Sequence, residues 1–236
     1  MQSIERSHFL NLAAVFEGGL LLVAMFLGWL MDVNPIEHLY ADVDGLLWGV
    51  IATVPMLILL AVSFRIPIDS LQAIKKILID TLGAPLAACR WYDLFLLGLL
   101  AGVTEEILFR GFLQIWFEKG GMWSGLIFAN VIFGLAHFVT PTYALLAGLM
   151  GLYFSWTFTW QEPRNLLVPI TAHTVYDFIA FWAVAHEYRT LTAAGKASST
   201  PKEPSATVDD PSVSTEPVSS ISEDPHNAPN DDDTLE

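Results

Sequence analysis

The chain has 236 residues, of which 53% are hydrophobic and only 15% are charged, and its formal net charge is -14. Charged residues make up roughly a quarter of a soluble globular domain, so this composition and a mean hydropathy of +0.49 exclude an ordinary soluble globule. The acidic balance excludes a nucleic-acid-binding surface, which must neutralise phosphates. A single cysteine, Cys89, excludes an internal disulfide and a cysteine-based zinc knuckle.

The apolar residues and the acidic charge lie in different parts of the chain. Residues 1–189 carry 9 Lys and Arg against 15 Asp and Glu, whereas residues 190–236 carry 2 against 10. The second segment is rich in Ser, Pro and Thr and cannot bury enough apolar area to fold by itself. We therefore predict a transmembrane domain over 1–189, followed by a disordered acidic tail over 190–236.

Several stretches are long and apolar enough to cross a hydrocarbon core, which takes about 20 residues. The six predicted spans are 10–31, 46–64, 92–117, 122–140, 143–160 and 166–186. Between the second and third spans, apolar residues recur at helical spacing at Ile68, Leu71, Ile74, Ile77 and Leu78. This pattern indicates an amphipathic helix at the membrane interface. The expected fold is all-α, a polytopic bundle of about six transmembrane helices plus one interfacial helix.

Lysine and arginine are distributed unevenly between the two sides of the predicted membrane. The larger group comprises Arg6, Arg65, Lys75, Lys76, Arg90, Arg189, Lys196 and Lys202. The smaller group comprises Lys119 and Arg164. Positively charged loops are retained in the cytoplasm. We therefore expect both termini to be cytoplasmic.

Ionisable residues gather inside three of the predicted spans. The third span carries two acids and an arginine, the fourth ends with a histidine, and the sixth carries a histidine and an aspartate: Glu105, Glu106, Arg110, His137, His173 and Asp177. Such groups are costly within a membrane and mark function unless they are paired. Any one of them could serve helix packing alone, but their joint occurrence favours a functional site.

Helical spacing separates the roles of the two neighbouring acids. Glu106 lies one turn before Arg110, so the two side chains share a face and can pair. Glu105 is rotated by about 100° from Glu106 and fits Arg110 less well. Glu105 is therefore the candidate general base. His173 and Asp177 are also one turn apart, so Asp177 can orient the imidazole.

The depth of each side chain in the membrane indicates whether Glu105, His137 and His173 can reach one another. At about 1.5 Å per residue from the external end of each helix, Glu105 lies roughly 18 Å deep and His137 roughly 21 Å deep. On the same basis His173 lies roughly 11 to 15 Å deep. The three side chains can therefore reach one cavity. Phe133, one turn before His137, can form a wall beside the histidine ring.

The first span carries one further acid. Glu17 lies beside Gly18 and Gly19 and has no visible partner in the sequence. Glycine allows helices to approach closely. We therefore expect a helix-packing or interfacial role for Glu17.

Three motifs follow one another on these spans: Glu105-Glu106-x-x-x-Arg110, Phe133-x-x-x-His137 and His173-x-x-x-Asp177. In this order they resemble the motifs of the CAAX-prenyl-protease and bacteriocin-processing (CPBP, or ABI) membrane proteases, over about residues 91–182. The run Glu-Glu-Ile-Leu-Phe-Arg-Gly-Phe-Leu is very similar to the first motif of that family. The resemblance implies an intramembrane endopeptidase of a bacterial inner membrane, with a peptide or a membrane protein as its substrate.

The resemblance also implies roles for single residues. Glu105 would activate a water molecule with the aid of His137, and His173 and Asp177 would support the oxyanion. Eukaryotic prenyl-protein proteases have Asn where Asp177 stands, and an ionised Asp cannot donate a hydrogen bond. Asp177 is therefore either protonated in its apolar setting or orients His173. The residues implied to shape the site are Glu106 and Arg110.

Two alternatives to this function stay open. In a zinc-dependent version of the protease, the metal would be held by Glu105, His137 and His173, since carboxylate and imidazole suit zinc. The chain has no His-Glu-x-x-His motif, so a mechanism without a cofactor is favoured. A non-enzymatic membrane scaffold or a proton-coupled transporter belongs to a different class, because intramembrane Glu and His also relay protons. The order of the three motifs favours the protease.

Overall fold

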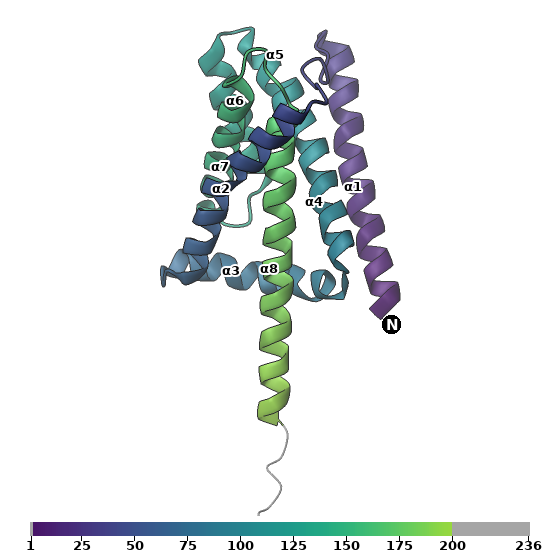
Figure 1. The fold of residues 1–236 in the computed structure, drawn as a ribbon, viewed down its shortest axis with the longest axis vertical. Coiled ribbons are helices and arrows are strands. Elements are labelled where there is room, and N and C mark those ends of the chain that lie inside the picture. The colour runs from purple at the N-terminus through teal and green to yellow at the C-terminus, as the bar shows by residue number, and fades with distance from the viewer. Residues whose placement is uncertain (1, 200–236) are drawn as a thin grey trace, which may run out of the picture. The chain divides into compact units, whose positions relative to one another are not determined.

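The fold is all-α, as predicted from the long apolar stretches. The computed structural model describes residues 2–199, and within that range it contains no strand. The order of the elements (Figure 1) is α1 (Gln2–Met31), α2 (Val43–Arg65), α3 (Asp69–Ala88), α4 (Trp91–Glu106), a π-helix η1 (Ile107–Gln114), α5 (Ile115–Glu118), α6 (Met122–Ala136), α7 (Pro141–Thr159) and α8 (Leu167–Ser199). Each predicted span overlaps a helix or, for 92–117, the continuous run from α4 through η1 to α5, although several bounds differ.

Only some of these helices satisfy the length and hydropathy of a full span. Among the described residues, three do so: Arg6–Met31, Val43–Arg65 and Leu167–Ala194. Met122–Ala136 is a shorter apolar helix, and the third predicted span is divided between α4, η1 and α5. The chain is an integral membrane helix bundle. The number of six crossings stays a prediction.

The final helix passes the predicted end of the transmembrane domain. Helix α8 continues through residues 190–199 to Ser199. This stretch contains three alanines, which favour a helix and allow it to continue beyond the apolar segment. The rest of the predicted acidic tail, residues 200–236, lies outside the described residues.

Helix α3 runs across the bundle, whereas α1, α4 and α8 run roughly alongside one another (Figure 1). It packs against α8, α1 and α2. It begins near the predicted amphipathic stretch and continues beyond Leu78 to Ala88. Its buried positions include Ile74 and Ile79, and the charged Lys76 and Asp80 are exposed and pair with each other. This arrangement is that of an interfacial helix, apolar on one face and charged on the other.

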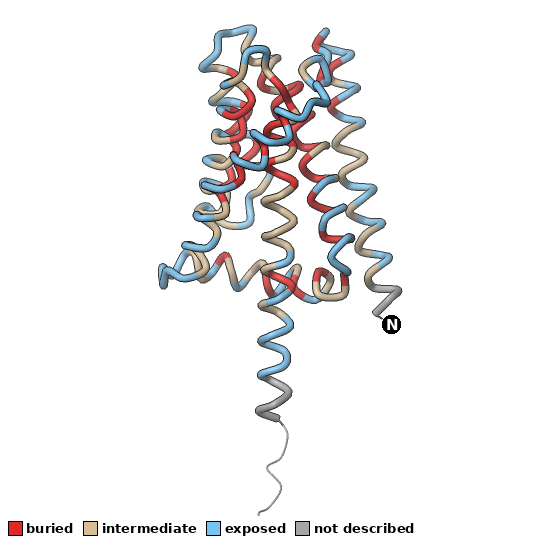
Figure 2. Tube along the Cα trace, in the orientation of Figure 1, coloured by how far each residue is buried: buried red, intermediate tan, exposed pale blue. Residues whose placement is uncertain are grey.

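The outer surface of the bundle is apolar and its interior contains charged groups. Large exposed hydrophobic residues are common on α1 and α2, including Phe16, Trp29 and Leu59. Most of α1 is exposed or half-buried, whereas buried residues are more frequent on α4, η1 and the first part of α8 (Figure 2). An apolar exterior is what contact with lipid requires, because lipid cannot hydrate polar side chains. The interior acids and bases are therefore the unusual feature.

Short polar side chains begin several helices and link their ends. Asp42 accepts a hydrogen bond from the backbone N–H of Gly45 at 2.6 Å, which caps α2. Asn165 accepts from the backbone N–H of Leu167 at 2.9 Å, and its amide donates to Asp42 at 2.6 Å. The starts of α2 and α8 are thus held together, and α2 is fixed against the helix that carries the third motif.

Helices α4 and α8 approach each other at glycine. A Cβ atom added at Gly102 would lie 2.6 Å from Thr174 Oγ1 and 3.0 Å from the Thr174 backbone nitrogen. Only glycine therefore fits at this position without displacing α8. The close approach brings the first motif on α4 and η1 beside the third motif on α8.

Candidate active site

A cavity of about 480 Å³ lies between the helices that carry the three motifs. Its far end is lined by apolar residues of α2 and α3, such as Leu59 and Ile74. Its polar lining near the motifs comprises Glu17, Glu105, His137, Tyr143, His173, Tyr176 and Asp177. Four predicted site residues therefore line one cavity, and they come from α4, the end of α6 and α8.

The other two predicted site residues, Glu106 and Arg110, lie behind the cavity wall and are both 0% exposed. Arg110 Nη1 donates to Glu106 Oε1 at 3.1 Å, the pairing that the one-turn spacing predicted. The same oxygen lies 2.8 Å from His173 Nδ1. A carboxylate only accepts hydrogen bonds, so Nδ1 is the donor in this contact. Glu106 thus connects the first motif to the third.

Arg110 has two further acceptors that the motifs did not indicate. Its Nη2 donates to Asn130 Oδ1 at 3.1 Å and to the backbone carbonyl of Gly151 at 2.7 Å. Asn130 could have been found in the sequence, because it is a polar residue in an apolar helix two turns before His137. Gly151 acts through its backbone and leaves no sequence signal. These contacts hold the guanidinium in one orientation.

The first motif continues directly into a π-helical segment. Arg110 lies in η1, which begins one residue after Glu106. Single π-helical segments inside α-helices occur often at functional sites. The wider turn does not separate the pair, and Glu106 and Arg110 remain in contact.

Glu105 and His137 form a more open pair. Glu105 Oε2 lies 3.7 Å from His137 Nε2, too far for a hydrogen bond. Glu105 is 8% exposed, and its Oε2 is buried without a hydrogen-bond partner. His137 Nδ1 donates to the Phe133 carbonyl oxygen at 2.9 Å, because a carbonyl only accepts. In a neutral imidazole Nε2 then carries a lone pair, so two acceptors face each other.

His173 lies between two carboxylates. Its Nε2 is 3.5 Å from Asp177 Oδ2, the contact predicted from their one-turn spacing. Its Nδ1 is closer to Glu106, at 2.8 Å. The imidazole also stacks on the Phe154 ring, with centroids 4.7 Å apart. Glu106 and Phe154 therefore orient His173 together with Asp177.

Phe133 separates the open pair from the buried arginine. Its ring stacks on His137 with centroids 4.5 Å apart, as the motif spacing predicted. The Arg110 guanidinium carbon lies 4.7 Å from the same ring centroid. A cation over an aromatic face is attracted by the ring quadrupole. Phe133 thus fixes His137 and covers Arg110.

Glu17 has a partner that the sequence did not indicate. Thr104 Oγ1 donates to Glu17 Oε2 at 2.5 Å, and Thr104 directly precedes Glu105. Glu17 also lines the same cavity as Glu105. The expected role in helix packing is therefore incomplete, because the side chain adds a third carboxylate near the first motif.

The ligand set proposed for zinc is not assembled. Between the first and last described residues, no group of three His, Cys, Asp or Glu side chains is placed to hold a metal ion. The reason lies in His173, whose two ring nitrogens face Glu106 and Asp177. Glu105, His137 and His173 therefore do not converge as ligands, and the metalloprotease alternative is not supported.

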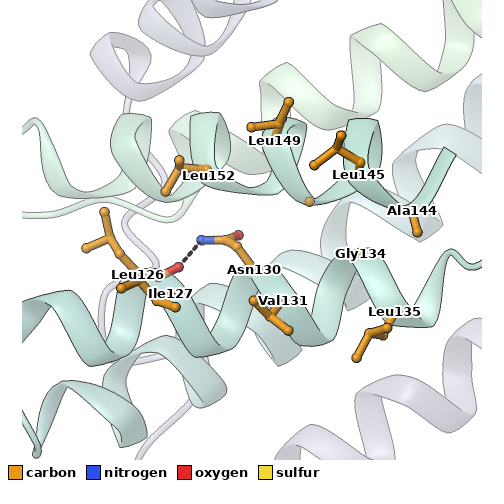
Figure 3. A pocket seen from close by; sticks show the side chains of 11 residues that line it. Leu126, Ile127, Asn130, Val131, Gly134, Leu135, Ala144, Leu145, Leu149 and Leu152 are labelled. Atoms are coloured by element: carbon orange, nitrogen blue, oxygen red, sulfur yellow. Dashed lines mark hydrogen bonds between the residues drawn. The ribbon is translucent and has the colours of Figure 1, made fainter. Parts of the chain in front are cut away.

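A separate groove of about 360 Å³ lies between α6 and α7. Figure 3 shows leucine side chains such as Leu145 and Leu149 along one side and Val131 and Leu135 along the other. Its polar lining residue Asn130 donates to the Leu126 carbonyl oxygen at 2.6 Å. None of the six predicted site residues lines this groove.

The fold and the site together define an integral membrane protein with a buried acid and base cluster around an internal cavity. Residues 87–179 match the family model described as Type II CAAX prenyl endopeptidase Rce1-like. All three motifs lie within the matched segment. The match agrees with the family predicted from the motifs, and residues 87–179 are the part of the chain that is similar to it.

A curated relative matches over a similar length. Uncharacterized protein YpbD of Bacillus subtilis (strain 168) is 34% identical over 99 residues. The match covers 39% of this chain and 46% of the relative, so the chain spans less than half of that protein's length. No solved structure matches the chain significantly.

Proposed function

We propose that the protein is an intramembrane endopeptidase in which Glu105 and His137 activate water to hydrolyse a peptide bond. The observation that carries this proposal is the pair of facing acceptors, Glu105 Oε2 and His137 Nε2, at 3.7 Å. A water molecule between them can donate one hydrogen to each, which leaves an oxygen lone pair free for attack. The match to a prenyl endopeptidase family supports a peptidase over the transporter and scaffold alternatives.

Hydrolysis at this pair balances as an ordinary general-base reaction. The water oxygen adds to the carbonyl carbon while Glu105 takes the water proton, and the carbonyl electron pair moves to its oxygen. When the carbonyl re-forms, the C–N bond breaks and Glu105 returns the proton to the departing nitrogen. His137 holds the water through Nε2, and its own orientation is fixed by the hydrogen bond to Phe133.

The buried pair of Glu106 and Arg110 supports this reaction from outside the cavity lining. Glu106 binds both Arg110 and His173, so it fixes η1 against α8. The imidazole of His173 is thereby held at the cavity wall. A constellation held this firmly keeps the reacting groups aligned, which is where much of the rate enhancement of an enzyme arises.

The cavity suggests how a substrate enters. One end is lined by Leu71, Ile74 and Leu78 of the interfacial helix α3. Lys75 and Lys76 also lie on α3, and by the positive-inside rule this end faces the cytoplasm. We propose that a peptide or membrane-protein segment enters there from the cytoplasmic half of a bacterial inner membrane. Both termini are then cytoplasmic.

The test uses the purified full chain in liposomes with two fluorogenic peptides, one farnesylated at a CAAX-type C-terminus and one identical but unmodified. Wild type is expected to cleave at least one peptide, and Glu105→Gln is expected to cleave neither. Mass spectrometry identifies the cut bond, and ¹⁸O from labelled water should appear in the new carboxylate. Equal cleavage by wild type and Glu105→Gln would exclude the proposed mechanism.

A further inference from the structure

The proposed reaction needs a hydrogen-bond donor for the oxyanion, and the predicted motifs do not supply a free one. An ionised Asp177 only accepts hydrogen bonds. Both ring nitrogens of His173 face carboxylates, at 2.8 Å and 3.5 Å. The two Nη atoms of Arg110 are directed at Glu106, Asn130 and a backbone carbonyl, and Arg110 is not among the cavity-lining residues.

Tyr143 provides such a donor. Its side chain lines the cavity together with Glu105, His137 and Asp177. Within the described part of the chain, its hydroxyl has no hydrogen-bond partner. A substrate carbonyl bound in this cavity beside Glu105 would share the cavity with this hydroxyl.

The backbone of Tyr143 is held in a fixed position. Its N–H donates to Thr140 Oγ1 at 3.1 Å, the N-cap contact that begins α7, and Pro141 occupies the first turn. A capped helix start with proline leaves little backbone freedom. Oxyanion stabilisation depends on donors that are already oriented before the charge develops. The capped start of α7 fixes the backbone from which the Tyr143 side chain extends into the cavity.

Tyr176 is the second tyrosine in the cavity, but its surroundings differ. It packs against the hydrophobic cluster that contains Met56 and Phe154. Because Tyr176 packs against this hydrophobic cluster, the assignment falls on Tyr143.

We infer that Tyr143 donates the hydrogen bond that stabilises the tetrahedral oxyanion, an inference that rests on the proposed hydrolytic function. The phenol keeps its proton throughout, and only the strength of its hydrogen bond to the substrate oxygen changes. The Tyr143 hydroxyl thus supplies the hydrogen bond that an ionised Asp177 cannot donate. In a site shielded from water, one such donor contributes about 10²–10³-fold to kcat.

Tyr143→Phe tests this role in the liposome assay with the peptide that wild type cleaves faster. The expected result is a loss of about 10²–10³-fold in kcat with little change in KM or melting temperature. Tyr153→Phe is the matched control, since Tyr153 lies on the same helix, does not line the cavity and donates to the Ala52 carbonyl oxygen. The control should retain the wild-type rate.

A second substitution separates donation from structural support. Asp177→Asn in the Tyr143→Phe background introduces an amide donor at the cavity, and we expect part of the lost kcat to return. A double variant slower than Tyr143→Phe alone would contradict the inference. A loss confined to KM would also overturn it, because the hydroxyl would then bind substrate rather than the oxyanion.

Failure of the inference can be distinguished from failure of the proposed function. If wild type cleaves the peptide in a Glu105-dependent way and Tyr143→Phe retains the full kcat, only the role of Tyr143 is overturned. If wild type shows no Glu105-dependent cleavage, the proposed function fails and the inference fails with it.

Discussion

Two adjacent acids occupy opposite environments in this bundle. Glu106 is 0% exposed and binds both Arg110 and His173. Glu105, one residue earlier, faces the cavity with an unpartnered Oε2 beside His137. A rotation of about 100° along the helix is enough to send one carboxylate into a paired cluster and the other into the open pair. Two adjacent glutamates can therefore differ in role, one paired within the structure and the other open to the cavity.

The two environments meet at one aromatic ring. Phe133 stacks on His137 and also lies against Arg110. The closed cluster of Glu106, Arg110 and His173 is thus a support behind the open pair of Glu105 and His137. Substitutions should distinguish them, since the cluster should affect stability and the pair should affect turnover.

The largest expected effect belongs to the open pair. Glu105→Gln keeps the shape of the side chain but cannot accept the water proton, so kcat should fall by about 10²–10⁴-fold. The melting temperature in detergent should stay near that of wild type, because the buried Oε2 of Glu105 has no hydrogen-bond partner to lose. Kinetics and thermal unfolding of the same preparation check both statements. A large drop in melting temperature would place Glu105 in the structural cluster instead.

The closed cluster should respond with lost stability. Glu106→Gln leaves Arg110 buried without its countercharge, and breaking a buried pair costs about 3–5 kcal/mol. Denaturant unfolding in detergent micelles measures this loss, and activity should fall with it. If Glu106→Gln has the same free energy of unfolding as wild type, Asn130 and the Gly151 carbonyl are sufficient partners for the guanidinium.

Gly151→Ala tests the cluster without a change of charge. The new Cβ would lie 2.6 Å from Asn130 Oδ1 and 3.0 Å from Arg110 Nη2, so both must move. Overpacking of this kind costs about 1–3 kcal/mol of unfolding free energy. Gly19→Ala is the matched control, because a Cβ there meets no atom within 4 Å. Equal unfolding free energies for the two variants would contradict the described fit around Arg110.

The smallest expected effect is that of metal chelation. Because His173 faces Glu106 and Asp177 rather than the open pair, the cleavage rate should be unchanged after dialysis against a strong chelator. The metal content of the dialysed protein is measured alongside the rate. An activity that disappears with the chelator and returns with zinc would require a different arrangement of His173.

The sequence determined the helices and the contacts within them. Apolar runs of spanning length predicted the helix positions, because a segment in lipid must satisfy its backbone hydrogen bonds internally. One-turn spacing predicted the pairing of Glu106 with Arg110 and the stacking of Phe133 on His137, both of which are observed. These contacts depend only on helical periodicity. The end of α8 was less predictable, because an alanine-rich segment can extend a helix past its apolar part.

Only the tertiary structure decided which residues on different helices contact one another. The contact of His173 with Glu106, the contacts of Arg110 with Asn130 and Gly151, and that of Thr104 with Glu17 join residues far apart in sequence. Their formation depends on helix rotation and separation, which are set by close approaches such as that of Gly102 to Thr174. Spacing along one helix carries no information about the rotation of its neighbour, so these contacts could not be read from the sequence.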